Sequence, residues 1–210
     1  MSPRPQVDHI RRPQILGAAA EVIAERGVAA TRISDIAERS GTSAPAVLYW
    51  FKSKDELLAE ALTFEEERFY DEVTRLLADE PSASRRLALL IDASSGPNEL
   101  WIEFWARALR KPDAAATRRE LDRRWRGTIL EIVRDGQAAG EFGGGDPEEA
   151  SAVLAALMDG LAVQVSLEDP EMPGPRMATL ARGVAERLLD CRLPAPREPA
   201  ASALAGGDLG

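Results

Sequence analysis

The chain has 210 residues, of which 45% are hydrophobic and 5% aromatic, with a formal net charge of -9 and one cysteine. The single cysteine excludes an internal disulfide and a cysteine-based metal site, and it indicates a reducing cytoplasm. The N-terminus lacks the apolar core of a signal peptide. The most apolar run, residues 150–166, is short for a bilayer and is interrupted by Asp159, so we expect no membrane segment.

Helix is the expected secondary structure throughout. Ala, Leu, Glu and Arg are abundant, and no stretch shows sustained alternation of apolar and polar residues. The predicted fold class is therefore all-α, with a small helix-turn-helix head and a larger helical body.

The charge is unevenly divided along the chain. Residues 1–54 contain eight Lys or Arg against five Asp or Glu, whereas residues 55–210 contain 18 against 30. A basic end suits a polyanion such as DNA, and an acidic body would repel DNA and so help to present that end. The acidic surface equally serves solubility.

Three short helices are predicted at the basic end. The first runs from about Gln14 to Arg26 and has one apolar face. A second pattern begins at Ile33 and ends at Gly41, because a residue without a Cβ can adopt the left-handed turn that stops a helix. Ser43 can cap a third helix, with Pro45 in its first turn. This arrangement predicts a helix-turn-helix.

The stretch from Ile33 to Leu58, ISDIAERSGTSAPAVLYWFKSKDELL, resembles the DNA-binding domain of tetracycline-repressor (TetR) family regulators. That pattern runs G-x-S, then a recognition helix ending in aromatics, then x-S-K-x-x-L-L. The resemblance implies base contacts from the start of the third helix, phosphate and sugar contacts from its aromatic end, and a phosphate gripped by Lys54. Leu48 departs from the pattern, which often has a tyrosine there.

Together, the resemblance and the side-chain chemistry predict a DNA-binding set: Arg32, Thr42, Ser43, Ala44, Pro45, Ala46, Tyr49, Trp50, Lys52 and Lys54. Small residues let a helix approach the major groove closely, and basic residues reach phosphates. The alternative for Tyr49 and Trp50 is that they fill the core of a helical protein.

The fourth helix begins at Ser53, which forms a capping box with Glu56, and continues to about Leu77. Beyond it we predict helices at 84–93, 99–109, 114–139, 147–167 and 175–191. The domains expected are an arm and DNA-binding head at 1–54, a ligand-binding and dimerisation body at 55–192, and a disordered tail at 193–210, which is poor in bulky apolar residues.

The last two helices predict a dimer. The first of them is apolar almost all round and must be buried on more than one side. Two such helices from each of two subunits would form a four-helix bundle across a two-fold axis, as is common in the family. The alternative is that they only close the core of one subunit. The predicted interface residues are Leu154, Leu157, Gly160, Leu161, Val184 and Leu188.

The middle helices concentrate the tryptophans. Aromatic faces with nearby carboxylates can enclose a cation, and the W-x-x-F-W-A stretch resembles the C-terminal domain of BetI-like, choline-responsive members of the family. A cationic small-molecule effector is therefore expected, although the same aromatics could be core filling. The candidate ligand-binding residues are Phe64, Trp101, Glu103, Phe104, Trp105, Trp125 and Met158.

Enzymatic motifs are missing from the sequence. We find no H-x-x-x-H, no G-x-S-x-G and no Gly-rich phosphate loop after a strand, so no catalytic residue, metal or cofactor is expected. The sequence thus predicts a homodimeric, ligand-released repressor of a palindromic operator. The alternative is a helical protein-interaction module without DNA binding, which a neutral head lacking Lys54 would favour.

Overall fold

The computed structural model describes residues 5–195, which form α-helices joined by turns and contain no strand. The helices are α1 (Pro5–Ala30), α2 (Ile33–Arg39), α3 (Ala44–Trp50), α4 (Lys54–Leu77), α5 (Ala83–Ala93), α6 (Glu99–Ala108), α7 (Pro112–Ala138), α8 (Pro147–Ser166) and α9 (Gly174–Leu188). The all-α prediction is confirmed. From residue 196 onward the predicted tail lies outside the described residues.

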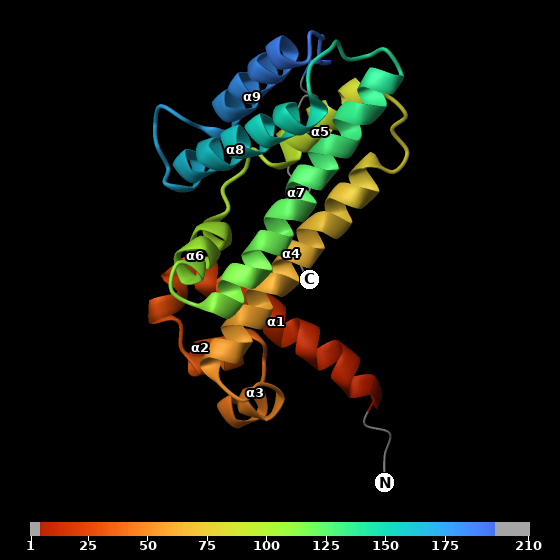
Figure 1. Ribbon diagram of the computed structural model, residues 1–210. Coiled ribbons are helices and arrows are strands. Elements are labelled where there is room, and N and C mark those ends of the chain that lie inside the picture. Colours follow the sequence, from red (N-terminus) through yellow and green to blue (C-terminus); the bar gives the residue numbers. More distant parts are fainter. Residues whose placement is uncertain (1–4, 196–210) are drawn as a thin grey trace.

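A small head occupies one end of the molecule (Figure 1). It consists of α1, α2, α3 and the start of α4, which bury a common hydrophobic cluster. α1 begins well before the predicted Gln14, and Gly27 (φ 73°) breaks its helical path near the predicted end. Arg39 of α2 donates hydrogen bonds to Glu21 and Glu25 of α1 at 2.9 and 2.8 Å, which fixes the two helices against each other.

The body is built around α4 and α7, the two long helices that run side by side from the head to the far end (Figure 1). The Tyr70 hydroxyl on α4 donates to the Leu121 carbonyl on α7 at 3.1 Å, and Arg124 of α7 pairs with Glu67 of α4 at 2.9 Å. These contacts hold the two helices in a fixed register, so residues of both can line one cavity.

The far end of the body is held by side chains that satisfy backbone groups. Glu141, just after α7, accepts hydrogen bonds from the amides of Ala83 and Ser84 at the start of α5, at 3.0 and 2.9 Å. The Ser84 amide and the Ser82 hydroxyl lower the pKa of the Glu141 carboxyl to about 2. A carboxylate here complements the positive end of the helix dipole.

α8 is long and apolar enough to cross a membrane by length and composition, with a mean hydropathy of 1.2. In the structure it packs between α7 and α9, and one side of it joins the body core. Asp146 caps its first turn by accepting from the Glu148 amide at 2.9 Å. Here one side of α8 is thus a core face, and its other side is left open in the subunit.

Candidate DNA interface and effector cavity

The turn between α2 and α3 has the geometry predicted from its residues. Gly41 has φ 61°, and the Thr42 amide donates to the Ala37 carbonyl at 2.8 Å, which closes the C-terminus of α2. The Ser43 hydroxyl accepts from the Ala46 amide at 3.3 Å and so caps α3, with Pro45 in its first turn. These local bonds set the direction of α3.

One face of α3 is anchored in the head, and the opposite face is open. Val47 and the C-capping Phe51 are fully buried. Leu48 is 49% exposed and Tyr49 77% exposed. Trp50 is half-buried, packs against the head core and meets the Tyr49 ring edge-on at 5.4 Å. Tyr49 therefore lies on the surface, whereas Trp50 contributes to both core and surface.

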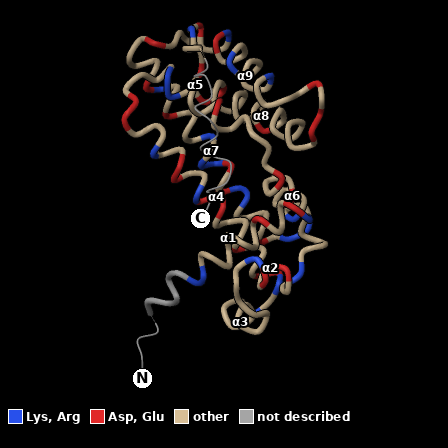
Figure 2. Tube along the Cα trace, turned by 180° about the vertical axis from the view of Figure 1, so that it is seen from behind, with Lys and Arg blue, Asp and Glu red and all other residues tan. Residues whose placement is uncertain are grey.

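The small and basic residues predicted to meet DNA flank this open face. Ser43 and Pro45 are exposed and Thr42, Ala44 and Ala46 are half-buried, all at the turn or in the first turns of α3. α3 itself carries no charged side chain (Figure 2). The basic residues come from outside α3: Arg32 and Lys52 are exposed, and Lys54 is half-buried at the start of α4.

The start of α4 is tightly capped beside Lys54. The Ser53 hydroxyl accepts from the Glu56 amide at 3.1 Å, and the Glu56 carboxylate accepts from the Lys52 amide at 2.6 Å. This is the predicted capping pair, with the acid reaching one residue beyond the cap. It places the N-terminus of α4, with its positive dipole end, at the edge of the α3 face.

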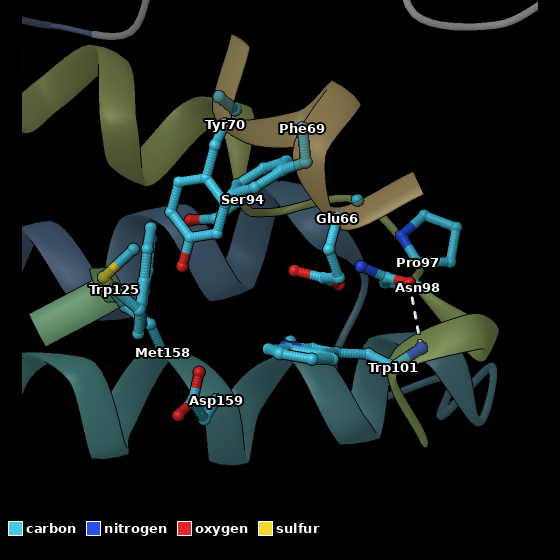
Figure 3. Close-up of a pocket in the computed structure, with 13 residues that line it drawn as sticks. Glu66, Phe69, Tyr70, Ser94, Pro97, Asn98, Trp101, Trp125, Met158 and Asp159 are labelled. Carbon is cyan, nitrogen blue, oxygen red and sulfur yellow. Dashed lines mark hydrogen bonds between the residues drawn. The ribbon is translucent and has the colours of Figure 1, made fainter. Parts of the chain in front are cut away.

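A cavity of about 150 Å³ lies inside the body, between α4, α6, α7 and α8 (Figure 3). It is lined by Glu66, Phe69, Tyr70, Ala93, Ser94, Gly96, Pro97, Asn98, Trp101, Trp125, Met158, Asp159 and Ala162. This volume has room for several water molecules and so for a small organic ligand.

Two carboxyl groups point into the cavity from opposite sides, Glu66 from α4 and Asp159 from α8 (Figure 3). Burial, with a contribution from the charge of Glu67, raises the pKa of Glu66 to about 8. Burial and the neighbouring Asp122 raise the pKa of Asp159 to about 6. Among the side chains that the structure describes, residues 11–195, none forms a hydrogen bond or an ion pair with either carboxyl. Both are available to a ligand.

The walls of the cavity are aromatic. Trp101 of α6 and Trp125 of α7 face it together with Phe69 and Tyr70 of α4 (Figure 3). The Phe69 and Trp125 ring centroids are 6.1 Å apart. At one end Asn98, which caps α6 by accepting from the Trp101 amide at 3.1 Å, adds a polar amide. Aromatic faces and buried carboxyls together are suited to an organic cation.

The structure brings together three of the seven residues predicted for the ligand: Trp101, Trp125 and Met158 line the cavity. The other four lie elsewhere. Phe104 is buried and stacks on Trp101 at 5.9 Å, while Trp105 packs against the body core. Phe64 packs against the head core, and Glu103 lies against Gly27 of α1.

Among the cavity residues that the sequence did not predict are both carboxyls and two of the aromatics: Glu66, Asp159, Phe69 and Tyr70. Glu66 stands in the run Glu65–Glu67, which reads as a solvated acidic face. Asp159 offered a usable signal, because a lone acid inside an otherwise apolar helix is costly unless it has a role. The interruption of the apolar run at residues 150–166 was that signal.

The residues predicted for a dimer interface fall into two groups. Leu154 and Leu161 are buried in the subunit's own core. Leu157, Val184 and Leu188 pack only partly against that core, and Gly160 is exposed. With their exposed neighbours they form an open apolar surface, which we call the α8–α9 face: Val153, Ala156, Leu157, Gly160, Leu180, Val184 and Leu188. Val153 and Leu180 are 43% and 40% exposed.

Comparison with family models gives two matches. Residues 15–61 match the model described as "Bacterial regulatory proteins, tetR family". Residues 87–190 match "BetI-type transcriptional repressor, C-terminal". The first match covers the helix-turn-helix, and the second covers most of the body, including the α6, α7 and α8 contributions to the cavity.

Known proteins similar to this chain extend over nearly its whole length. The HTH-type transcriptional regulator BetI of Escherichia coli is 28% identical over 189 residues, 86% of this chain and 94% of that protein. A transcriptional regulator from Saccharomonospora viridis, solved in complex with choline, is 30% identical with a TM-score of 0.79, covering 85% of this chain and 96% of that one. A TetR transcription regulator from Haloarcula marismortui is 26% identical with a TM-score of 0.73, covering 87% and 97%.

Proposed function

Because the chain belongs to the TetR family of DNA-binding transcriptional regulators, we propose that it is a cytoplasmic repressor that binds a palindromic operator as a homodimer. A small organic cation entering the cavity between α4 and α8 releases it from DNA. The observation that carries the effector class is the pair of unpartnered carboxyls, Glu66 buried and Asp159 half-buried, in an aromatic cavity.

DNA docking follows from the open face of α3. The half-buried Ala44 and Ala46 allow close approach to the major groove, and the exposed Tyr49 lies at the far end of α3, where it can reach the sugar-phosphate backbone. Lys54 supplies positive charge at the start of α4. Two heads related by a two-fold axis would meet successive major grooves, which matches a palindrome. With few polar side chains on α3, DNA shape and Arg32 contribute to specificity.

Lys54→Ala should weaken binding to all DNA sequences alike, because a phosphate contact carries no base information. We expect the slope of log affinity against log salt to fall by about one per subunit. Fluorescence anisotropy with operator and random DNA at several salt concentrations measures both effects. Arg85→Ala is the charge-matched control, an exposed arginine on α5 at the far end of the body. Unchanged affinity of Lys54→Ala at moderate salt would show that the proposed docking is wrong.

The effect of effector binding is transmitted to the head through α6. Asn98 and Trp101 at the start of α6 line the cavity. Farther along the same short helix, Arg107 approaches the Asp55 carbonyl at 3.4 Å, at the start of α4. Glu103 lies so close to Gly27 that a Cβ there would be 2.9 Å from its carboxylate. A ligand that moves Trp101 would therefore shift α1 and α4, and favour a state in which the two heads cannot dock together.

The test of this function uses operator DNA selected from a random pool. Choline should quench or enhance tryptophan fluorescence, since Trp101 and Trp125 line the cavity, and should release the selected DNA. The neutral isostere 3,3-dimethylbutanol, which has the same shape without the charge, should do neither. If choline changes neither fluorescence nor DNA affinity, the cation-effector proposal is contradicted.

A further inference from the structure

We propose that the cavity exchanges a proton for its effector: Glu66 is protonated while the cavity is empty and gives up that proton when a cation enters beside Asp159. This inference rests on the proposed function, in which the cavity takes a small organic cation. It adds that the regulator responds to effector concentration and pH together.

The charges inside the cavity do not balance. Glu66 and Asp159 share a space of about 150 Å³ (Figure 3), and none of the residues that line it in the described chain is Lys, Arg or His. Two ionised carboxylates in a small, partly desolvated space without a counter-charge are strongly disfavoured. The empty cavity lowers this cost by holding a proton, and the filled cavity by holding a cation.

The charges around the cavity do not supply the missing balance. The charged groups that act on Glu66 from the elements packed around it are Glu65 and Glu67 of α4 and Asp122 and Arg124 of α7. Asp159 of α8 lines the same cavity. Arg124 is paired with Glu67 at 2.9 Å. Asp122 is paired with Arg118 at 2.6 Å. The residues that α6 and its preceding turn contribute to the lining are uncharged.

The two carboxyls differ in how readily they are protonated, and the proton resides on Glu66. Glu66 is buried, with 9% of its surface exposed, whereas Asp159 is half-buried and feels the positive charge of Arg118. Accordingly the pKa of Glu66 is raised to about 8 and that of Asp159 only to about 6. At neutral pH, Asp159 is therefore mostly ionised and Glu66 mostly protonated. Tyr70 stays neutral, because burial raises its pKa further above its usual value.

A cation held by Asp159 would cause the protonated Glu66 carboxyl to ionise. An opposite charge within about 4–6 Å lowers the pKa of a carboxyl by about 1–3. Glu66 would then titrate at a lower pH than it does in the empty cavity. In the interval between the two titrations, near neutral pH, each cation bound would release up to one proton. Because protons compete with the cation in this range, affinity must rise as pH rises, by at most about tenfold per pH unit for one proton exchanged.

The experiment is isothermal titration calorimetry of choline into the full-length protein at pH 6.5, 7.0, 7.5 and 8.0, in phosphate and in HEPES. The two buffers have different ionisation enthalpies, so the difference between the measured heats counts the protons released. For the unmodified protein we expect the Kd for choline to fall at least about threefold per pH unit, with proton release into the buffer.

Two variants test whether the released proton comes from Glu66. Glu66→Gln keeps the size of the side chain but cannot ionise. Between pH 7.0 and pH 8.0, where Asp159 is already mostly ionised, its Kd should be nearly independent of pH and its binding should release almost no proton. Asp71→Asn is the matched control, an exposed acid farther along α4 that does not line the cavity. This control should keep the pH dependence of the Kd for choline that the unmodified protein shows. Operator binding by each variant confirms that it is folded.

The outcomes separate the two proposals. Choline binding with a pH-independent Kd and no proton release would overturn the exchange and leave the effector class standing. A pH dependence that survives in Glu66→Gln would overturn the role of Glu66. No choline binding at any of the four pH values would overturn the effector class, and the proton exchange with it.

Discussion

Asp159→Asn should raise the Kd for choline by about 30- to 150-fold while leaving operator affinity unchanged. The substitution keeps the shape of the side chain and removes the charge that faces the cation. Removing one partner from a buried charge pair costs about 2–3 kcal/mol at the low end of the usual range, and every 1.4 kcal/mol is about tenfold in Kd. Tryptophan fluorescence titration at pH 7.5 measures the change.

Protein stability gives a second, independent readout of Asp159→Asn. The unpartnered carboxyl is half-buried and its pKa is raised to about 6, so ionised Asp159 opposes folding at neutral pH. The asparagine variant should melt at the same temperature as the unmodified protein or a higher one. Asp71→Asn, an exposed acid on α4, is the control and should change neither property. Unimpaired choline binding by Asp159→Asn would show that Asp159 is not the counter-ion.

Ala156→Arg should produce a monomer and reduce operator affinity by at least about 100-fold. Ala156 is exposed in one subunit, at the centre of the α8–α9 face, so an arginine there can be accommodated by the isolated chain. Across a two-fold axis the same substitution would place two desolvated positive charges in one interface, which costs several kcal/mol. Loss of the dimer then removes the second head and the avidity it provides.

Analytical ultracentrifugation and operator titration test this result. Ala138→Arg, an exposed alanine at the end of α7 and outside the α8–α9 face, is the control and should remain dimeric. Circular dichroism should show the same helix content in both variants. A dimeric Ala156→Arg protein with unchanged operator affinity would mean that the chain pairs through another surface.

In the head, the features that depend on nearby residues could be predicted from the sequence. Gly41, Ser43 and the Ser53 capping pair act through bonds to residues three to five positions away, so their effects can be read from the sequence. The beginning of α1 is earlier than predicted, because Pro13 and the charged residues before it suggest a break, and a continuous apolar face begins only at Ile15. Helix type and order were predictable there, and the exact ends were less so.

α6 shows where local signals stop. Trp101, Phe104 and Trp105 are spaced to share one side of a helix, and all three were predicted to meet the ligand. Only Trp101 lines the cavity, because the cavity meets α6 at its first turn and the later aromatics pack against α7 and the core. The position of a cavity along a helix depends on its neighbours and has no local signature.

The same limit applies to α8. Its residues are apolar on nearly every side, so periodicity could not decide which side faces the subunit's core. The structure turns Leu154 and Leu161 inward and leaves Ala156 and Gly160 open.

By itself the sequence determined the all-α class, the helix-turn-helix, the basic head on an acidic chain and the family. These depend on short-range hydrogen bonds, helical periodicity and composition, all of which are encoded within a few turns of the chain. Only the tertiary structure decided that Glu66 of α4 and Asp159 of α8 share one cavity with Trp101 and Trp125. The two carboxyls are 93 positions apart in the sequence, and their raised pKa values arise from burial that exists only once α4, α7 and α8 have packed together.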